Sequence, residues 1–108
     1  MPLNIPESDW RRFKEIHPRL LELYCSRILH ELTVASERPG SSAHERYVKV
    51  YKLIEDRDKQ LARAFNDFRR STAIMQMGIM LRMKLLTDED LRLFSEQTQT
   101  QVEGIASL

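Results

Sequence analysis

The chain has 108 residues, of which 42% are hydrophobic and 31% charged, and its formal net charge is +1. These values are typical of one globular domain, and they exclude a disordered chain and an overall charge that would draw the protein to nucleic acid or membrane. Cys25 is the single cysteine, which excludes an intrachain disulfide and fits a reducing compartment. Met1 to Glu7 lacks the regions of a secretory signal, and no apolar run approaches the roughly 18 residues of a membrane span. We therefore expect a cytoplasmic protein.

The first predicted helix covers about residues 7–35. Pro6 suits the start of a helix, and Glu7 and Asp9 suit the positive end of its dipole. Apolar residues then recur every three or four positions, which is typical of a helix with one face on a core. Pro18 lies inside this pattern and removes one backbone hydrogen bond. It therefore predicts a kink, or a break that makes two helices.

A short loop over residues 36–41 separates the first helix from the second. It concentrates the turn-forming residues of the chain, in the sequence Ser36-Glu37-Arg38-Pro39-Gly40-Ser41. Because a loop of this length cannot reach far, the flanking helices should pack as an antiparallel pair.

A single long helix is predicted over residues 42–86. Ser42 and Glu45 form a capping-box pattern, in which each side chain accepts a hydrogen bond from the backbone N–H of the other residue. Steps of three and four then pick out one apolar seam, which two charged residues interrupt: Tyr47, Tyr51, Ile54, Asp58, Leu61, Phe65, Phe68, Thr72, Met75, Ile79, Arg82 and Leu86.

The length of this helix needs an explanation. At about 1.5 Å per residue it would span roughly 67 Å, whereas a compact domain of about 100 residues has a radius of gyration of only about 13 Å. Either the helix breaks near Ser71, where the hydroxyls of Ser71 and Thr72 can cap a new turn, or a partner chain covers the overhanging part. We favour the partner.

The third predicted helix covers about residues 88–102, with Thr87 as its N-cap, and residues 103–108 are expected to form a frayed tail. The predicted fold is thus one all-α domain, a bundle of three main helices. The first is kinked at Pro18, the second is very long or broken near Ser71, and dimerisation completes the bundle.

The two charges in the seam suggest how a dimer would form. If two long helices pack antiparallel about a two-fold axis near Arg70, Asp58 of one chain faces Arg82 of the partner subunit. The predicted interface consists of Asp58, Leu61, Phe65, Phe68, Thr72, Met75, Ile79 and Arg82. The alternative is that each charge lies at the edge of the seam or pairs within its own chain.

The segment from Ile74 to Leu86 has almost no polar face and contains Met75, Met77, Met80 and Met83. A helix that is apolar nearly all round must be covered on several sides. The favoured interpretation is a core helix wrapped by the first and third helices. A subunit interface and a methionine-rich groove for a partner peptide remain open.

A mostly basic stripe lies opposite the seam. Lys52, Lys59, Arg63 and Arg70 recur at helical spacing and could contact phosphates of a nucleic acid. The favoured alternative is an ordinary solvated face, because the net charge is close to zero and no aromatic residues are interleaved with the basic ones.

One acidic pair keeps an enzymatic hypothesis open. Glu55 and Asp58 lie on one helical face, and carboxylates are the ligands that Mg²⁺ prefers. All-α nucleoside triphosphate pyrophosphatases use paired motifs of this kind, but this chain has one, so a second would have to come from a dimer partner. The alternative is an i,i+4 ion pair between Glu55 and Lys59.

Patterns typical of other catalytic sites are missing from the sequence. Its three glycines form no phosphate-binding loop, its histidines form no Glu-x-x-His pair, and Cys25 has no histidine one helical turn away. We expect no cofactor. The sequence favours a small non-enzymatic interaction or regulatory module, a homodimeric helical bundle that binds another macromolecule. A nucleic-acid-binding protein is the first alternative, and a metal-dependent all-α nucleotide hydrolase is the second.

Overall fold

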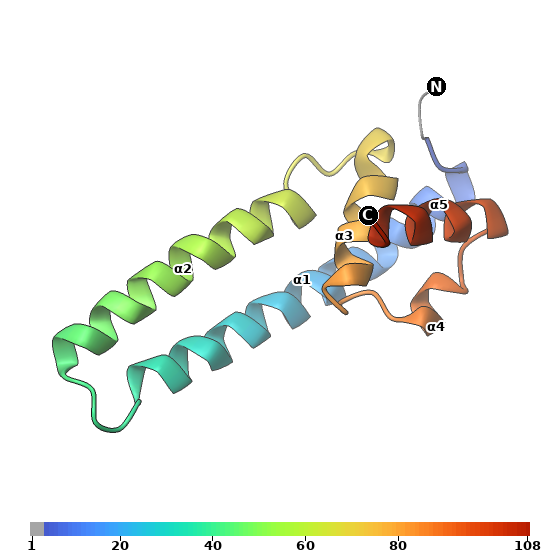
Figure 1. The fold of residues 1–108 in the computed structure, drawn as a ribbon. Coiled ribbons are helices and arrows are strands. Elements are labelled where there is room, and N and C mark those ends of the chain that lie inside the picture. The colour runs from blue at the N-terminus through green and yellow to red at the C-terminus, as the bar shows by residue number, and fades with distance from the viewer. Residues whose placement is uncertain (1–3) are drawn as a thin grey trace.

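The computed structural model describes residues 4–108 as an all-helical fold, in which a two-helix arm extends from a compact head (Figure 1). The molecule measures 52 × 25 × 23 Å. The described residues form no β-strand, and their helical elements are α1 (Glu7–Ser36), α2 (Ala43–Phe65), the 3₁₀ turn η1 (Arg70–Thr72), α3 (Ala73–Arg82), α4 (Asp88–Leu91) and α5 (Glu96–Ala106). Met1 to Leu3, part of the segment searched for a secretory signal, lie outside the described residues.

The arm consists of α2 and the C-terminal half of α1, which run antiparallel as predicted (Figure 1). α1 continues through Pro18 as one helix, so the predicted break into two helices is wrong. The capping box at the start of α2 is confirmed, because the Glu45 N–H donates to Ser42 Oγ at 3.1 Å and the Ser42 N–H donates to Glu45 Oε1 at 3.3 Å.

The single helix predicted over residues 42–86 is wrong, and the predicted alternative, a helix broken near Ser71, is confirmed. α2 ends at Phe65, Asn66 is extended, and Asp67 has a positive φ of 55°. The chain restarts at η1, where Thr72 Oγ1 accepts from the Arg69 N–H at 3.1 Å and donates to the Asp67 carbonyl at 2.7 Å. The break therefore lies just before Ser71, and the Thr72 hydroxyl ties the connecting turn together.

The reason for the break is α3, which lies at the centre of the head. Its buried residues are Ala73, Ile74, Gln76, Met77, Gly78 and Met80. Gln76 is the one long polar side chain among them, and its amide donates to the Asn66 carbonyl. Because these residues occupy most sides of the helix, with Met75, Ile79 and Arg82 on the remaining side, several neighbours must pack against it, above all α5 and α2, and a straight continuation of α2 would prevent this. Most of the segment Ile74 to Leu86 is core, as the favoured interpretation predicted, but Met75 is 51% exposed.

The third predicted helix is also interrupted. Thr87 caps α4, as predicted, since its Oγ1 accepts from the Asp90 N–H at 3.0 Å. α4 ends at Leu91, and Ser95 starts α5 as a new N-cap. The buried Asp9 of α1 fixes this second start, because its carboxylate accepts from Ser95 Oγ and Thr98 Oγ1, both at 2.6 Å, and from the Ser95 N–H at 3.1 Å. The first turn of α1 thus holds the first turn of α5.

The frayed tail predicted over residues 103–108 is wrong as well, because α5 extends to Ala106. Ile105 packs against Gly78 of α3, where a Cβ atom on the glycine would lie 2.3 Å from Ile105 Cγ2. Arg82 donates to the Ile105 carbonyl at 3.0 Å and to the Ala106 carbonyl at 3.2 Å, which satisfies carbonyls at the end of the helix. Between residues 4 and 108, no helix is both long and apolar enough to cross a membrane.

We predict that Gly78→Ala and Gly104→Ala change stability in opposite directions. Both glycines are helical, and alanine gains up to about 1 kcal/mol in a helix interior. At Gly78 the new methyl group collides with Ile105, whereas at Gly104 it meets no atom within 4 Å. Overpacking costs about 1–3 kcal/mol. In urea unfolding, Gly78→Ala should therefore be less stable than Gly104→Ala by about that amount, and equal stabilities would contradict the close contact.

Candidate interaction surface

Two contacts hold the helices of the arm together. Arg57 of α2 donates from Nε and Nη2 to the carboxylate of Glu31 on α1, at 3.1 and 2.8 Å. These bonds hold the pKa of Glu31 below its ordinary value. Nearer the head, the Tyr24 hydroxyl contacts the Arg57 carbonyl at 3.1 Å and Gln60 Oε1 at 3.2 Å. The rotation of each helix about its own axis is therefore fixed, which decides the side chains that face solvent.

One edge of the arm carries exposed apolar side chains from α2. Tyr47 is 67% exposed, Tyr51 56% and Ile54 47%. They recur at steps of four and three, so they lie on one face of the helix, which continues through Asp58 to Leu61. Exposed apolar residues scattered singly are normal, but a contiguous row of them is typical of a binding surface.

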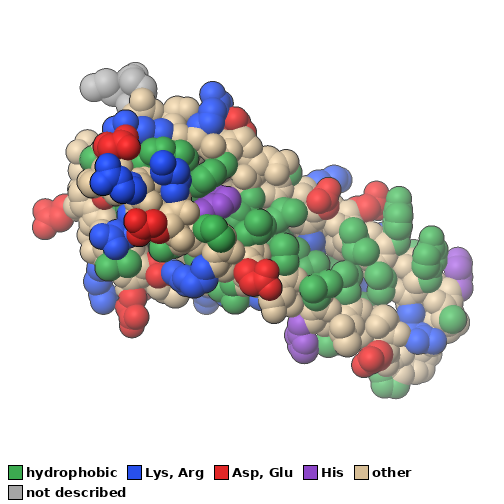
Figure 2. Space-filling model, turned by 180° about the vertical axis from the view of Figure 1, so that it is seen from behind, with side chains coloured by type: hydrophobic (Ala, Val, Ile, Leu, Met, Phe, Trp, Pro, Cys, Tyr) green, Lys and Arg blue, Asp and Glu red, His purple; other side chains and the backbone are tan. Residues whose placement is uncertain are grey.

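α1 extends this apolar edge. Leu21, Cys25, Ile28 and Leu32 follow the same four-and-three spacing, each is partly buried, and the neighbouring Leu29 is 64% exposed. The other edge of the arm holds a groove in which charged residues, among them Glu31, Lys49 and Arg57, alternate with Val34, Ala35 and Leu53. Figure 2 shows hydrophobic side chains gathered along the length of the arm. We call this surface the arm face; its members are Leu21, Cys25, Ile28, Leu29, Leu32, Tyr47, Tyr51, Ile54, Asp58 and Leu61.

Asp58 is the one charged residue of the arm face. Among residues 4–108 its carboxylate forms no hydrogen bond or ion pair, and its side chain is exposed. An unpaired carboxylate in an apolar row costs nothing in water, but it would need a hydrogen-bond donor if another surface covered the row.

An aromatic cluster closes the arm face at the head. His17 of α1 stacks on Phe68 with ring centroids 3.8 Å apart, and it meets the edges of Phe13 and Phe65 at 5.6 and 5.2 Å. Its Nε2 is buried and has no hydrogen-bond partner among the described residues. Burial lowers the pKa of the His17 imidazole, because the charged form loses its hydration. The cluster therefore favours a neutral His17.

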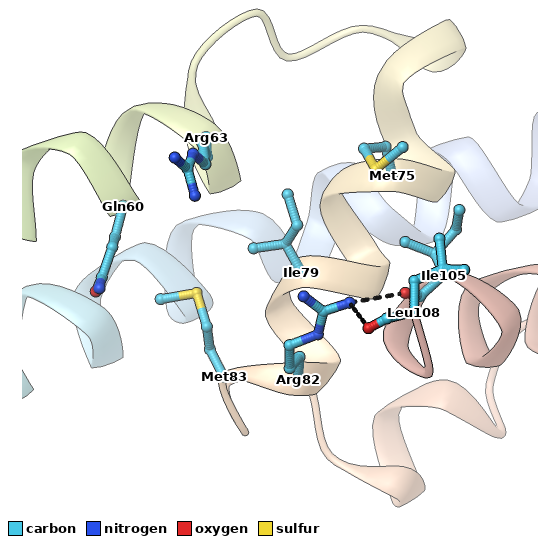
Figure 3. Close-up of a pocket in the computed structure, with 8 residues that line it drawn as sticks. All are labelled: Gln60, Arg63, Met75, Ile79, Arg82, Met83, Ile105 and Leu108. Atoms are coloured by element: carbon cyan, nitrogen blue, oxygen red, sulfur yellow. Dashed lines mark hydrogen bonds between the residues drawn. The ribbon is translucent and has the colours of Figure 1, made fainter.

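The predicted dimer interface does not form one surface. Asp58 and Leu61 lie on the arm face, whereas Phe65 is buried and Phe68 packs in the aromatic cluster. Thr72 ties the turn before α3, and Met75, Ile79 and Arg82 line a cavity on the head (Figure 3). The predicted register needed Asp58 and Arg82 on one straight helix. The break between α2 and α3 places them on two separate helices, so this requirement is not met and the predicted register is wrong.

The predicted phosphate-contacting residues are also separated. Lys52, Lys59 and Arg63 remain exposed on α2. Arg70 lies beyond the break, in η1, where it donates to the Ile5 carbonyl at 2.7 Å and pairs with Glu7 at 3.1 Å. The stripe therefore ends with α2, and Arg70 anchors the N-terminal segment to the head.

Glu55 and Asp58, the candidate metal ligands, are both exposed on the arm. Within the described part of the chain, no three His, Cys, Asp or Glu side chains are grouped so that they could hold a metal ion. The two carboxylates therefore gain no third ligand from the fold.

Sequence reasoning missed the contribution of α1 to the arm face, above all Leu29. The signal is the width of the apolar stripe on α1, which carries Leu21, Cys25, Ile28 and Leu32 in addition to the residues that face α2. One neighbouring helix cannot cover so wide a stripe.

Comparisons with protein-family models, curated proteins and solved structures gave no match.

The buried His17 predicts a dependence of stability on pH. Because its pKa is lower in the folded protein, the unfolded chain binds the proton more readily. The stabilisation by neutral His17 is complete above a pH of about 6.5, the value for an unfolded chain, and falls as the pH decreases below it. The free energy of unfolding should thus decrease between pH 7.5 and 5.5.

The variant His17→Phe should keep the ring stack, and its free energy of unfolding should decrease less between pH 7.5 and 5.5 than that of the natural protein. His44→Gln is the matched control, since His44 is exposed on the arm and should behave as the natural chain does. Urea unfolding at the two pH values measures the difference. A pH dependence that His17→Phe leaves unchanged would show that another group causes it.

Proposed function

We propose that this protein is a non-enzymatic interaction module that acts as a homodimer, with the arm face as its dimer interface. The observation that carries this proposal is the continuous apolar edge of the arm, in which Tyr47, Tyr51 and Ile54 are about half or more exposed. Covering such a surface gains roughly 25 cal/mol for each Å² of apolar area removed from water. A cytoplasmic location, suggested by the single cysteine, belongs to the same proposal.

A second copy of the chain suits the arm face for geometric reasons. The face spans two antiparallel helices, so two arms placed face to face complete a four-helix bundle, in which each helix has two neighbours. A two-fold axis supplies the same apolar row from both sides. The arms would point in opposite directions, and the two heads would lie at opposite ends of the bundle.

Asp58 gives this dimer a register. A two-fold axis between Tyr51 and Ile54 places Tyr51 opposite Ile54 of the partner subunit, and Asp58 opposite Tyr47 of the partner subunit. The tyrosine hydroxyl then supplies the donor that the Asp58 carboxylate needs when water leaves the face. The heads stay uncovered, which leaves them free to bind another macromolecule. The pairing of Asp58 with Arg82 plays no part in this arrangement.

Glutamate substitutions on the arm face should abolish the dimer without unfolding the chain. Tyr51→Glu and Ile54→Glu each place a charge in the proposed interface, yet both side chains are exposed in the single chain. Light scattering at several concentrations and two salt levels should give twice the 12.8 kDa chain mass for the natural protein and one chain mass for the variants.

The matched control is Leu93→Glu, because Leu93 is 52% exposed and lies on the head, away from the arm. It should leave the dimer intact. Circular dichroism at low concentration checks that all three variants keep their helices. A natural protein that stays monomeric throughout the concentration range rules out the homodimer.

The register is tested by exchanging charges at the proposed pair. Tyr47→Glu alone should weaken the dimer at least severalfold, because two carboxylates then face each other. Combining it with Asp58→Lys should restore association, since opposite charges then meet. The dissociation constants of the single and the double variant, measured by analytical sedimentation, test the proposed axis. If the double variant is no tighter than Tyr47→Glu, the axis lies elsewhere.

A further inference from the structure

A cavity opens where α2, α3 and α5 meet on the head, away from the arm face. Its volume is about 420 Å³, within the range of about 300–1,000 Å³ that is common for small-molecule sites. Apolar side chains form most of its wall, and three polar side chains join them; the lining consists of Met75, Ile79, Met83, Ile105, Leu108, Gln60, Arg63 and Arg82. Figure 3 shows these residues and the elements that carry them.

The two arginines of the cavity have different surroundings. Arg82 is engaged with α5, because its guanidinium donates to the carbonyls of Ile105 and Leu108 at 3.0 and 3.3 Å (Figure 3). Arg63, in the last turn of α2, forms no hydrogen bond or ion pair with any residue from 4 to 108. Arg63 is therefore the cation that is left to bind a group inside the cavity.

Gln60 lies one turn before Arg63 and also lines the cavity. Its Oε1 is 3.2 Å from the Tyr24 hydroxyl, whose one hydrogen is shared with the Arg57 carbonyl at 3.1 Å. The Gln60 amide is thus held near α1. Figure 3 shows the Gln60 amide directed from α2 towards α1, apart from the Arg63 guanidinium. Arg63 thus supplies the donor at one end of the apolar wall.

We propose that this cavity binds an aliphatic carboxylate, a molecule of the chemical class of a medium-chain fatty acid. The carboxylate accepts charge-assisted hydrogen bonds from the Arg63 guanidinium. The acyl chain lies along Ile79 and Met83, where the flexible methionine side chain adapts to its shape. This proposal does not depend on the dimer, because it uses no exposed residue of the arm face.

The methionines provide a direct test. Met75 and Met83 line the cavity, whereas Met77 and Met80 are fully buried elsewhere in α3. In protein with ¹³C-labelled methionine methyl groups, decanoate below its micellar concentration should shift the Met75 and Met83 signals saturably. The Met77 and Met80 signals should move little. Acetate, which has no acyl chain, and decanol, which has no charge, should both bind at least about tenfold more weakly.

Variants then locate the two ends of the ligand. Arg63→Gln should weaken decanoate binding about tenfold, since a charge-assisted hydrogen bond is lost. Lys59→Gln is the matched control, because it removes the same charge one turn earlier on α2, outside the cavity lining, and it should leave binding nearly unchanged.

Ile54→Glu on the arm face should also leave decanoate binding unchanged. A loss in that variant would place the acyl chain on the arm and overturn the proposal. Equal weakening by Arg63→Gln and Lys59→Gln, or the absence of any saturable shift in the natural protein, would overturn it too.

Discussion

The need to bury most of the surface of α3 is the constraint on which the rest of the fold depends. Its ten residues carry almost no polar surface, and six of them are buried. Burying an apolar helix of this kind requires neighbours on several sides. The chain meets the requirement by ending α2 at Phe65, turning, and sending α3 across the N-terminal half of α1, after which α4 and α5 return and α5 packs against α3. The Gly78–Ile105 contact then allows α3 and α5 to approach closely.

A buried carboxylate holds this wrapped head together. Asp9 and Ser95 are far apart in the sequence, yet three hydrogen bonds join Asp9 to Ser95 and Thr98 at the start of α5. Because a helix N-terminus presents unpaired N–H groups and a positive dipole, an acidic side chain from a neighbouring element suits it. Arg70 provides a second tie, from η1 to the Ile5 carbonyl. The N-terminal segment is thus connected both to η1 and to the start of α5.

Local signals in the sequence predicted the elements well where a cap or a loop decides them. Ser42 and Thr87 cap their helices as expected, and the loop before Ser42 pairs α1 with α2. The breaks near Asn66 and Arg92 carry weaker local signals. The apolar seam continues past Asn66, and the acidic start of α4 suggests a helix longer than the one observed. Both breaks follow from tertiary contacts. The first follows from the burial of α3 and the second from the hydrogen bonds between Asp9 and Ser95. Such contacts join residues far apart in the sequence, so local sequence patterns do not show them. The seam residues Tyr47, Tyr51 and Ile54 stay exposed, because the seam faces solvent along the arm.

The arm and the head differ in how much side-chain area they bury, and this difference sets how easily each part opens. Of the described residues between Cys25 and Arg63, none is buried, whereas most of α3 is. Amide groups in regions of low contact density exchange with solvent through local openings that cost less than global unfolding. The tip of the arm should therefore behave as a separate cooperative unit, which loses and regains its helices while the head stays folded. Binding of a partner to the arm would then first slow hydrogen exchange in α2. The affinity for that partner would include the free energy needed to order the tip of the arm.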